Sequence, residues 1–119
     1  MKRLLGTLVA AAFILGQAPA ARADAPSAQS ASPKPDAVVH IADFAYKPPT
    51  LTIHAGQTVL FVNDDGDAHT VTATDKSFDS GGLDSKEQWL HTFTKPGTYA
   101  YFCALHPYMK ATIVVTPAP

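Results

Sequence analysis

The sequence has little that could hold the chain together covalently or anchor it in a membrane. It contains one cysteine, Cys103, among 119 residues, so no internal disulfide can form. Its longest apolar run, residues 4–15, is shorter than the roughly 20 residues that a membrane-spanning helix needs. No segment has the periodicity of a long amphipathic helix. These absences predict a soluble protein built from strands, with a single thiol that serves some purpose other than a disulfide.

The first 23 residues have the parts of a secretory signal peptide. Lys2 and Arg3 precede the apolar run, and small residues at 21 and 23 frame a cleavage site. We expect cleavage after Ala23 and export to the periplasm. Cleavage removes three of the nine basic residues and none of the ten acidic ones, which leaves a net charge of about −4. A nucleic acid is therefore not an expected partner.

Downstream of the leader, the composition changes once. Residues 24–36 are rich in Ala, Pro and Ser without periodicity, which predicts a flexible linker. In residues 37–119, seven strand-sized runs alternate with turns rich in Gly, Pro and Asp. The runs are 38–44, 51–54, 58–63, 69–74, 88–94, 98–103 and 111–116. This spacing predicts one all-β domain, a seven- to eight-stranded antiparallel Greek-key β-sandwich. Its core should include Phe61, Trp89, Phe93, Tyr99 and Phe102.

The segment 103–109, Cys-Ala-Leu-His-Pro-Tyr-Met, is the most informative part of the chain. Cys103, His106 and Met109 are spaced by three residues, and on an extended strand such residues would lie roughly 10 Å apart on alternating faces. A helix is disfavoured because Pro107 would lie inside it and both flanks are strand sequence. The pattern predicts a tight loop between two strands that brings the three side chains together.

Thiolate, imidazole and thioether together favour copper or zinc. One Cys and two His in a plane, with a distant Met sulfur, is the ligand set of a blue-copper electron-transfer site. His69 is the best second imidazole because it opens a strand after the polar turn 64–67. The predicted site is therefore His69, Cys103, His106 and Met109, with one copper ion and with zinc as the chemical alternative.

The remaining histidines and the acidic turn have simpler interpretations. His40, His54 and His91 lie singly on predicted strands without ligand spacing, so they are not expected to bind metal. Asp64, Asp65 and Asp67 lack the pattern of a calcium loop and are interpreted as a solvated turn.

At this point the residues resemble a known family. The segments 78–83 and 93–99 and the loop 103–109, preceded by Asn63 and by His69-Thr70-Val71, are similar to those of the cupredoxins, and the short ligand loop is most similar to amicyanin. The resemblance covers roughly residues 38–116 and implies a type 1 copper centre and one-electron transfer. Two positions differ from many cupredoxins, in which Asn follows the first ligand His and Ser or Thr follows the Cys. Here they are Thr70 and Ala104, so the tie between the two ligand segments should be absent or made by backbone bonds.

The sequence thus predicts an electron carrier, with copper storage or delivery as the alternative and no enzymatic activity. An apolar collar of Leu105, Pro107 and Tyr108 around His106 is the expected docking patch for redox donors and acceptors. The negative charge favours a partner with a basic rim around an apolar centre, and the carrier itself is expected to be a monomer. Storage proteins usually offer several exchangeable Met and His ligands, whereas the processed chain would keep one Met.

Overall fold

The computed structural model describes Gly16 and residues 34–119, and it forms two packed sheets. The predicted signal peptide and most of the predicted linker lie outside the described residues. Asp36, at the end of that linker, already belongs to the folded part, because its N–H donates to the Thr58 carbonyl at 3.0 Å and its carboxylate accepts the Thr58 N–H at 2.8 Å. Among the described residues, no helical stretch has the length and apolarity to cross a bilayer.

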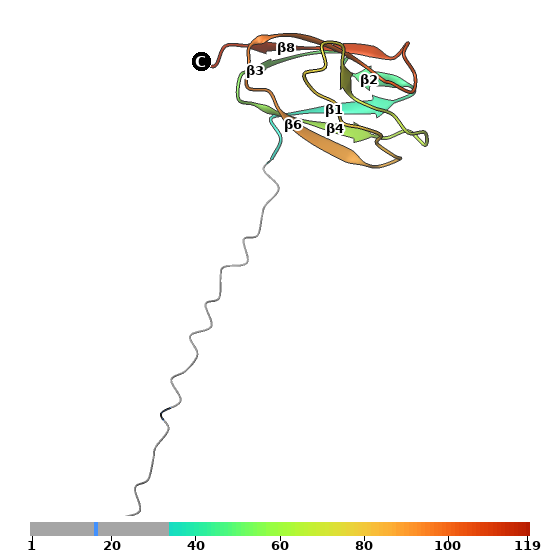
Figure 1. Cartoon of the computed structure of the whole chain (residues 1–119), viewed down its shortest axis with the longest axis horizontal. Coiled ribbons are helices and arrows are strands. Elements are labelled where there is room, and N and C mark those ends of the chain that lie inside the picture. Colours follow the sequence, from blue (N-terminus) through green and yellow to red (C-terminus); the bar gives the residue numbers. More distant parts are fainter. Residues whose placement is uncertain (1–15, 17–33) are drawn as a thin grey trace, which may run out of the picture. The chain divides into compact units, whose positions relative to one another are not determined.

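Eight strands make up the sandwich (Figure 1). They are β1 (Ala37–Ala42), β2 (Ala45–Lys47), β3 (Thr50–His54), β4 (Thr58–Asn63), β5 (Thr72–Ala73), β6 (Gln88–Thr92), β7 (Gly97–Phe102) and β8 (Lys110–Thr116). One sheet has the order β2-β1-β4-β6 and the other the order β3-β8-β7-β5. The predicted all-β sandwich is confirmed. The predicted run 69–74 is a strand only at Thr72 and Ala73, while His69 forms an isolated bridge with Leu83.

The pairing is not antiparallel throughout, in contrast to the prediction. β1 pairs with β4 in parallel, and β3 pairs with β8 in parallel, while the other pairs are antiparallel. The chain crosses between the sheets in both cases: β2 and β3 separate β1 from β4, and four strands separate β3 from β8. Alternating apolar residues are the same for both directions of pairing, so the sequence pattern could not distinguish them.

The core lies between the sheets and follows the strand alternation. On β4, Val59 and Phe61 are buried, and on β8, Ile113 and Val115 are buried, each separated by a more exposed neighbour. Full burial of such side chains contributes about 1.5–3 kcal/mol each to folding. The two sheets therefore pack through the side chains of every second residue on each strand.

The predicted aromatic core is confirmed except at one position. Phe61 and Phe93 are buried, and Trp89 and Tyr99 are partly buried and pack against the core. Phe102 is only half-buried and does not belong to the core cluster. Its neighbour Tyr101 is 1% exposed, because adjacent residues of a strand face opposite sides and β7 turns Tyr101 inward.

Candidate metal centre

The loop between β7 and β8 folds into tight turns. The Cys103 N–H donates to the Met109 carbonyl at 3.1 Å, the His106 N–H to the Cys103 carbonyl at 3.1 Å, and the Met109 N–H to the His106 carbonyl at 2.9 Å. These bonds fold residues 103–109 back on themselves at one end of the sandwich. The predicted tight loop is confirmed, and its physical basis is a closed set of backbone hydrogen bonds.

His69 is brought to this loop by a separate segment. The side chain of buried Asn63 donates to the carbonyls of Asp67 at 2.8 Å and Leu83 at 2.9 Å and accepts the Asp65 N–H at 3.0 Å, which shapes the turn before His69. His69 then exchanges two backbone hydrogen bonds with Leu83, of 3.0 and 2.7 Å. As a result, the His69 side chain is fully buried at the metal end.

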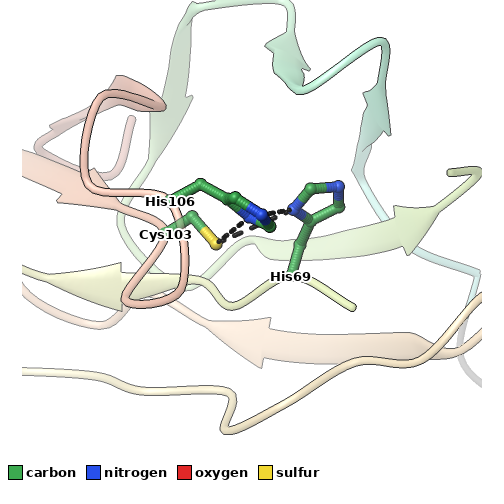
Figure 2. Close-up of side chains that lie close together, drawn as sticks. All are labelled: His69, Cys103 and His106. Carbon is green, nitrogen blue, oxygen red and sulfur yellow. Dashed lines mark hydrogen bonds between the residues drawn. The ribbon is translucent and has the colours of Figure 1, made fainter. Parts of the chain in front are cut away.

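Three of the four predicted ligands converge (Figure 2). His69 Nδ1 lies 3.1 Å from His106 Nδ1, and Cys103 Sγ lies 3.7 Å from His69 Nδ1 and 3.6 Å from His106 Nδ1. An ion at the centre of a trigonal plane, with bonds of about 2.0 Å to nitrogen and 2.3 Å to sulfur, would give edges of about 3.5 and 3.7 Å. The triangle therefore has about the size that a copper or zinc ion would need.

Met109 lies in the same loop and is 2% exposed. Its backbone is hydrogen-bonded to both Cys103 and His106. The three distances compared with a trigonal site join only the two imidazoles and the thiol. The assignment of Met109 as the fourth ligand therefore stays a prediction.

Thr70 joins the two ligand segments in an arrangement that the sequence did not reveal. The Thr70 N–H donates to Cys103 Sγ at 3.3 Å, and the Ala104 N–H donates to Thr70 Oγ1 at 2.7 Å. The tie expected to be absent or made by backbone bonds is thus present, made by two backbone N–H donors with Cys103 Sγ and Thr70 Oγ1 as the acceptors. Because both bonds start from backbone N–H groups, Ala104 needs no polar side chain.

Asp65 is the first residue that the sequence interpretation missed. Its Oδ2 lies 2.9 Å from His69 Nε2, and its side chain is only 15% exposed. Burial acts to raise the pKa of Asp65, but hydrogen bonds from the Phe44 and Asp43 N–H groups and from His69 outweigh it and lower the pKa. An ionised carboxylate accepting from Nε2–H leaves Nδ1 free to ligate a metal. The turn is therefore solvated in part, but Asp65 belongs to the site.

Phe44 is the second missed residue. Its ring centroid lies 5.2 Å from those of both His69 and His106, edge-on to each at 88°. It is 38% exposed, which is high for a large apolar side chain that contacts two candidate ligands. The sequence signal was weak: an aromatic residue in the short turn between β1 and β2.

The other histidines take no part in a metal cluster in the described part of the chain, where His69, Cys103 and His106 form the one group of three such side chains. His40 Nδ1 lies 2.7 Å from Asp64 Oδ2, His54 bonds to Thr116, and His91 stacks on Trp89 at 4.8 Å. Burial lowers the pKa of His91. These contacts place the three histidines outside the group formed by His69, Cys103 and His106.

The comparisons with known proteins agree with this geometry. The cupredoxin-like domain family matches residues 5–115. The chain is 32% identical to amicyanin of Paracoccus versutus over 108 residues, covering 86% of this chain and 76% of that protein. It is 35% identical to plastocyanin of Scenedesmus fuscus over 83 residues, covering 59% of this chain and 85% of that protein.

Solved structures give the same result. An amicyanin mutant in its Cu(I) form is 31% identical, with a TM-score of 0.62 over 66% of this chain and 80% of that chain. The copper-containing nitrite reductase of Thermus scotoductus SA-01 is 34% identical, with a TM-score of 0.65 over 70% of this chain but only 22% of the enzyme. From its sequence match, its two-sheet fold and its His-Cys-His triangle, the chain belongs to the cupredoxin family.

Proposed function

We propose that this protein is a small exported electron carrier that shuttles single electrons between redox partners through one type 1 copper held by His69, Cys103, His106 and Met109. The observation that carries the proposal is the triangle of Nδ1, Nδ1 and Sγ atoms with edges of 3.1, 3.6 and 3.7 Å. Copper with these ligands supplies a reversible one-electron couple.

The surroundings of the ligands favour a fixed geometry. Cys103 Sγ accepts the Thr70 N–H, its loop is closed by three backbone bonds, and His69 Nε2 is bonded to Asp65. Outer partners of this kind fix the orientation of ligand side chains. A site with little freedom to rearrange suits electron transfer, because little has to reorganise when the charge changes.

His106 is the ligand through which electrons should pass. His69 and Cys103 are fully buried, whereas His106 is only partly buried. Leu105 and Tyr108, which flank it, are 56% and 69% exposed, and Pro107 is also exposed. This collar supports the proposal of a docking patch for brief contacts with a redox protein, since small interfaces suit transient exchange.

We propose a carrier rather than an enzyme, because catalytic metal sites keep a ligand position open to substrate. Two of the three converging ligands have no solvent access, and only the His106 edge faces outward. The similarity to the nitrite reductase covers 22% of that chain, so it gives no support for the whole enzyme's activity. Storage or delivery is also disfavoured, since exchange of copper needs accessible ligands.

The location and assembly are further parts of the proposal. The basic start, apolar run and small-residue site of residues 1–23 support export and processing, and the periplasm keeps a small carrier near its partners. We propose that the processed protein acts as a monomer. Mass spectrometry of the exported protein would test cleavage after Ala23, and sedimentation would test the monomer.

The deciding experiment is the visible spectrum of the Cu(II)-loaded protein beside Cys103→Ser. We expect an intense blue thiolate-to-copper band that reductant bleaches and that the variant lacks, while both proteins keep the same far-UV circular dichroism. A colourless protein that still binds copper would refute electron transfer and favour delivery. Loss of copper to a chelator within seconds would point in the same direction.

A further inference from the structure

The Asp65 carboxylate joins three segments of the metal end. Oδ1 accepts the Asp43 N–H at 2.8 Å, and Oδ2 accepts the Phe44 N–H at 2.9 Å and lies 2.9 Å from His69 Nε2. One side chain from the 64–67 turn thus binds both a candidate ligand and the turn between β1 and β2. Charge-assisted hydrogen bonds of this kind are about twice as strong as neutral ones.

The turn that Asp65 holds has a backbone that needs such support. Asp43 and Phe44 both have left-handed φ angles, 53° and 56°. Neither residue is glycine, and such conformations cost free energy that surrounding contacts must offset. The two N–H groups point at Asp65, so the carboxylate stabilises the turn that presents Phe44.

The Phe44 ring links this turn to the exposed edge of the site. Its edge contacts with His69 and His106 at 5.2 Å cover one side of the ligand pair, while 38% of the residue remains exposed. His106 also has Tyr108 as a neighbour, with ring centroids 6.0 Å apart. Apolar surface therefore approaches His106 from the β1–β2 turn as well as from its own loop.

The charges beside Phe44 indicate what could dock there. Residues 43–47 and 64–67 contain four aspartates and one lysine. Asp43 is paired with Lys47 at 2.9 Å, yet its side chain is 87% exposed. A protein that approaches Phe44 therefore meets an apolar centre with excess negative charge on the side of the two turns.

From this arrangement, and resting on the proposed electron-carrier function, we propose that Phe44 is a docking residue for redox partners, held in place by Asp65 acting as a positioning residue. The partner class is a redox protein that presents an apolar centre with basic residues facing Asp43. The collar of Leu105, Pro107 and Tyr108 is then one part of the docking surface and Phe44 is another.

The test compares a basic protein probe with a small inorganic one. Stopped-flow rates of electron exchange would be measured with cytochrome c, a basic protein with an exposed haem edge, and with hexacyanoferrate, a small anion that offers no apolar docking surface. The readout is the ratio of the two rates. Phe44→Ala should lower the ratio about fivefold or more, because truncation of a hot-spot residue, unlike that of most interface residues, has an effect of at least this size. Leu90→Ala is the matched control, because Leu90 is 39% exposed on β6.

A double variant tests whether Asp65 acts on docking through Phe44. Asp65→Asn should also lower the ratio, while Asp75→Asn, which removes the same charge from an exposed turn, should not. If Asp65 acts on docking through Phe44, the double variant should lose no more than Phe44→Ala alone. Asp43→Asn should reduce the salt dependence of the cytochrome c rate, and it should raise the rate with the hexacyanoferrate anion, because it removes a repelling charge.

The failures of the two proposals can be told apart. A wild-type protein without a blue band would overturn the electron-carrier function itself. A blue wild type whose Phe44→Ala ratio equals that of Leu90→Ala would overturn only the docking role of Phe44. If Phe44→Ala does not fold by circular dichroism, Phe44→Asn replaces it in the comparison with Leu90→Ala, because Asn tolerates the left-handed φ of this position. An unchanged salt slope in Asp43→Asn refutes the basic partner.

Discussion

Replacing Thr70 by Val should loosen the metal end measurably. Thr70 is 6% exposed, and its Oγ1 accepts the Ala104 N–H at 2.7 Å. Val keeps the shape but removes the acceptor, which leaves that N–H without its partner and costs about 1.5 kcal/mol. For a domain of this size the melting temperature should fall by about 6–12 °C. Because the Thr70 N–H also bonds to Cys103 Sγ, the blue band should shift and copper should leave faster.

The assay is thermal unfolding followed by circular dichroism, with and without copper. The metal-free protein isolates the hydrogen bond, because bound metal adds stability of its own by mass action. Thr70→Ser keeps the hydroxyl and should recover about half of the loss, because the missing buried methyl still costs about 0.8 kcal/mol. Thr98→Val, at an exposed position on β7, is the control. Equal melting temperatures and spectra for the Val and Ser variants would refute this account of the tie.

Three further predictions concern buried side chains. Tyr46→Phe should lower the free energy of unfolding in urea by about 1–3 kcal/mol, because the buried Tyr46 hydroxyl donates to the Thr70 carbonyl. Tyr101→Phe should leave the free energy of unfolding unchanged or raise it, since the Tyr101 hydroxyl has no partner in the described residues. Burial raises the pKa of both tyrosines above 10.0, so both fold best as neutral groups. The contribution of the two neutral tyrosines to stability is therefore complete below pH about 10 and is lost at higher pH. A tyrosine absorbance titration should show two tyrosines that ionise only when the protein unfolds. Met109→Leu should change stability by less than about 1.5 kcal/mol but shift the reduction potential in voltammetry, and an unchanged potential would contradict Met109 as a ligand.

The ligand loop could be predicted because its information is local. Cys103, His106 and Met109 lie within seven residues, and Pro107 together with strand-like flanks leaves only a tight turn between two strands. His69 was found by a weaker argument, its position after a polar turn, and the structure places it in the triangle. The spacing within residues 103–109 therefore predicted the kind of metal site. The third converging ligand, His69, required the further assumption that its strand begins at the same end of the sandwich.

The contacts around the ligands could not be predicted, because they join segments far apart in the chain. Asp65 reaches back 21 and 22 residues to the Phe44 and Asp43 N–H groups, and Thr70 meets Ala104 across 34 residues. Nothing in an aspartate-rich turn distinguishes the residue that turns inward from those that stay in solvent. The choice depends on where β1 and β2 place their connecting turn.

By itself, the sequence determined the all-β class, the sandwich and the chemistry of the ligand set, because alternation, turn residues and donor types are properties of neighbouring residues. Only the tertiary structure decided the parallel pairing of β1 with β4 and of β3 with β8, since the same alternating face serves either direction. It also decided that Tyr101 rather than Phe102 enters the core and that Phe44 lies against both histidines. These features depend on how two sheets are placed relative to each other, which no single segment of the chain specifies.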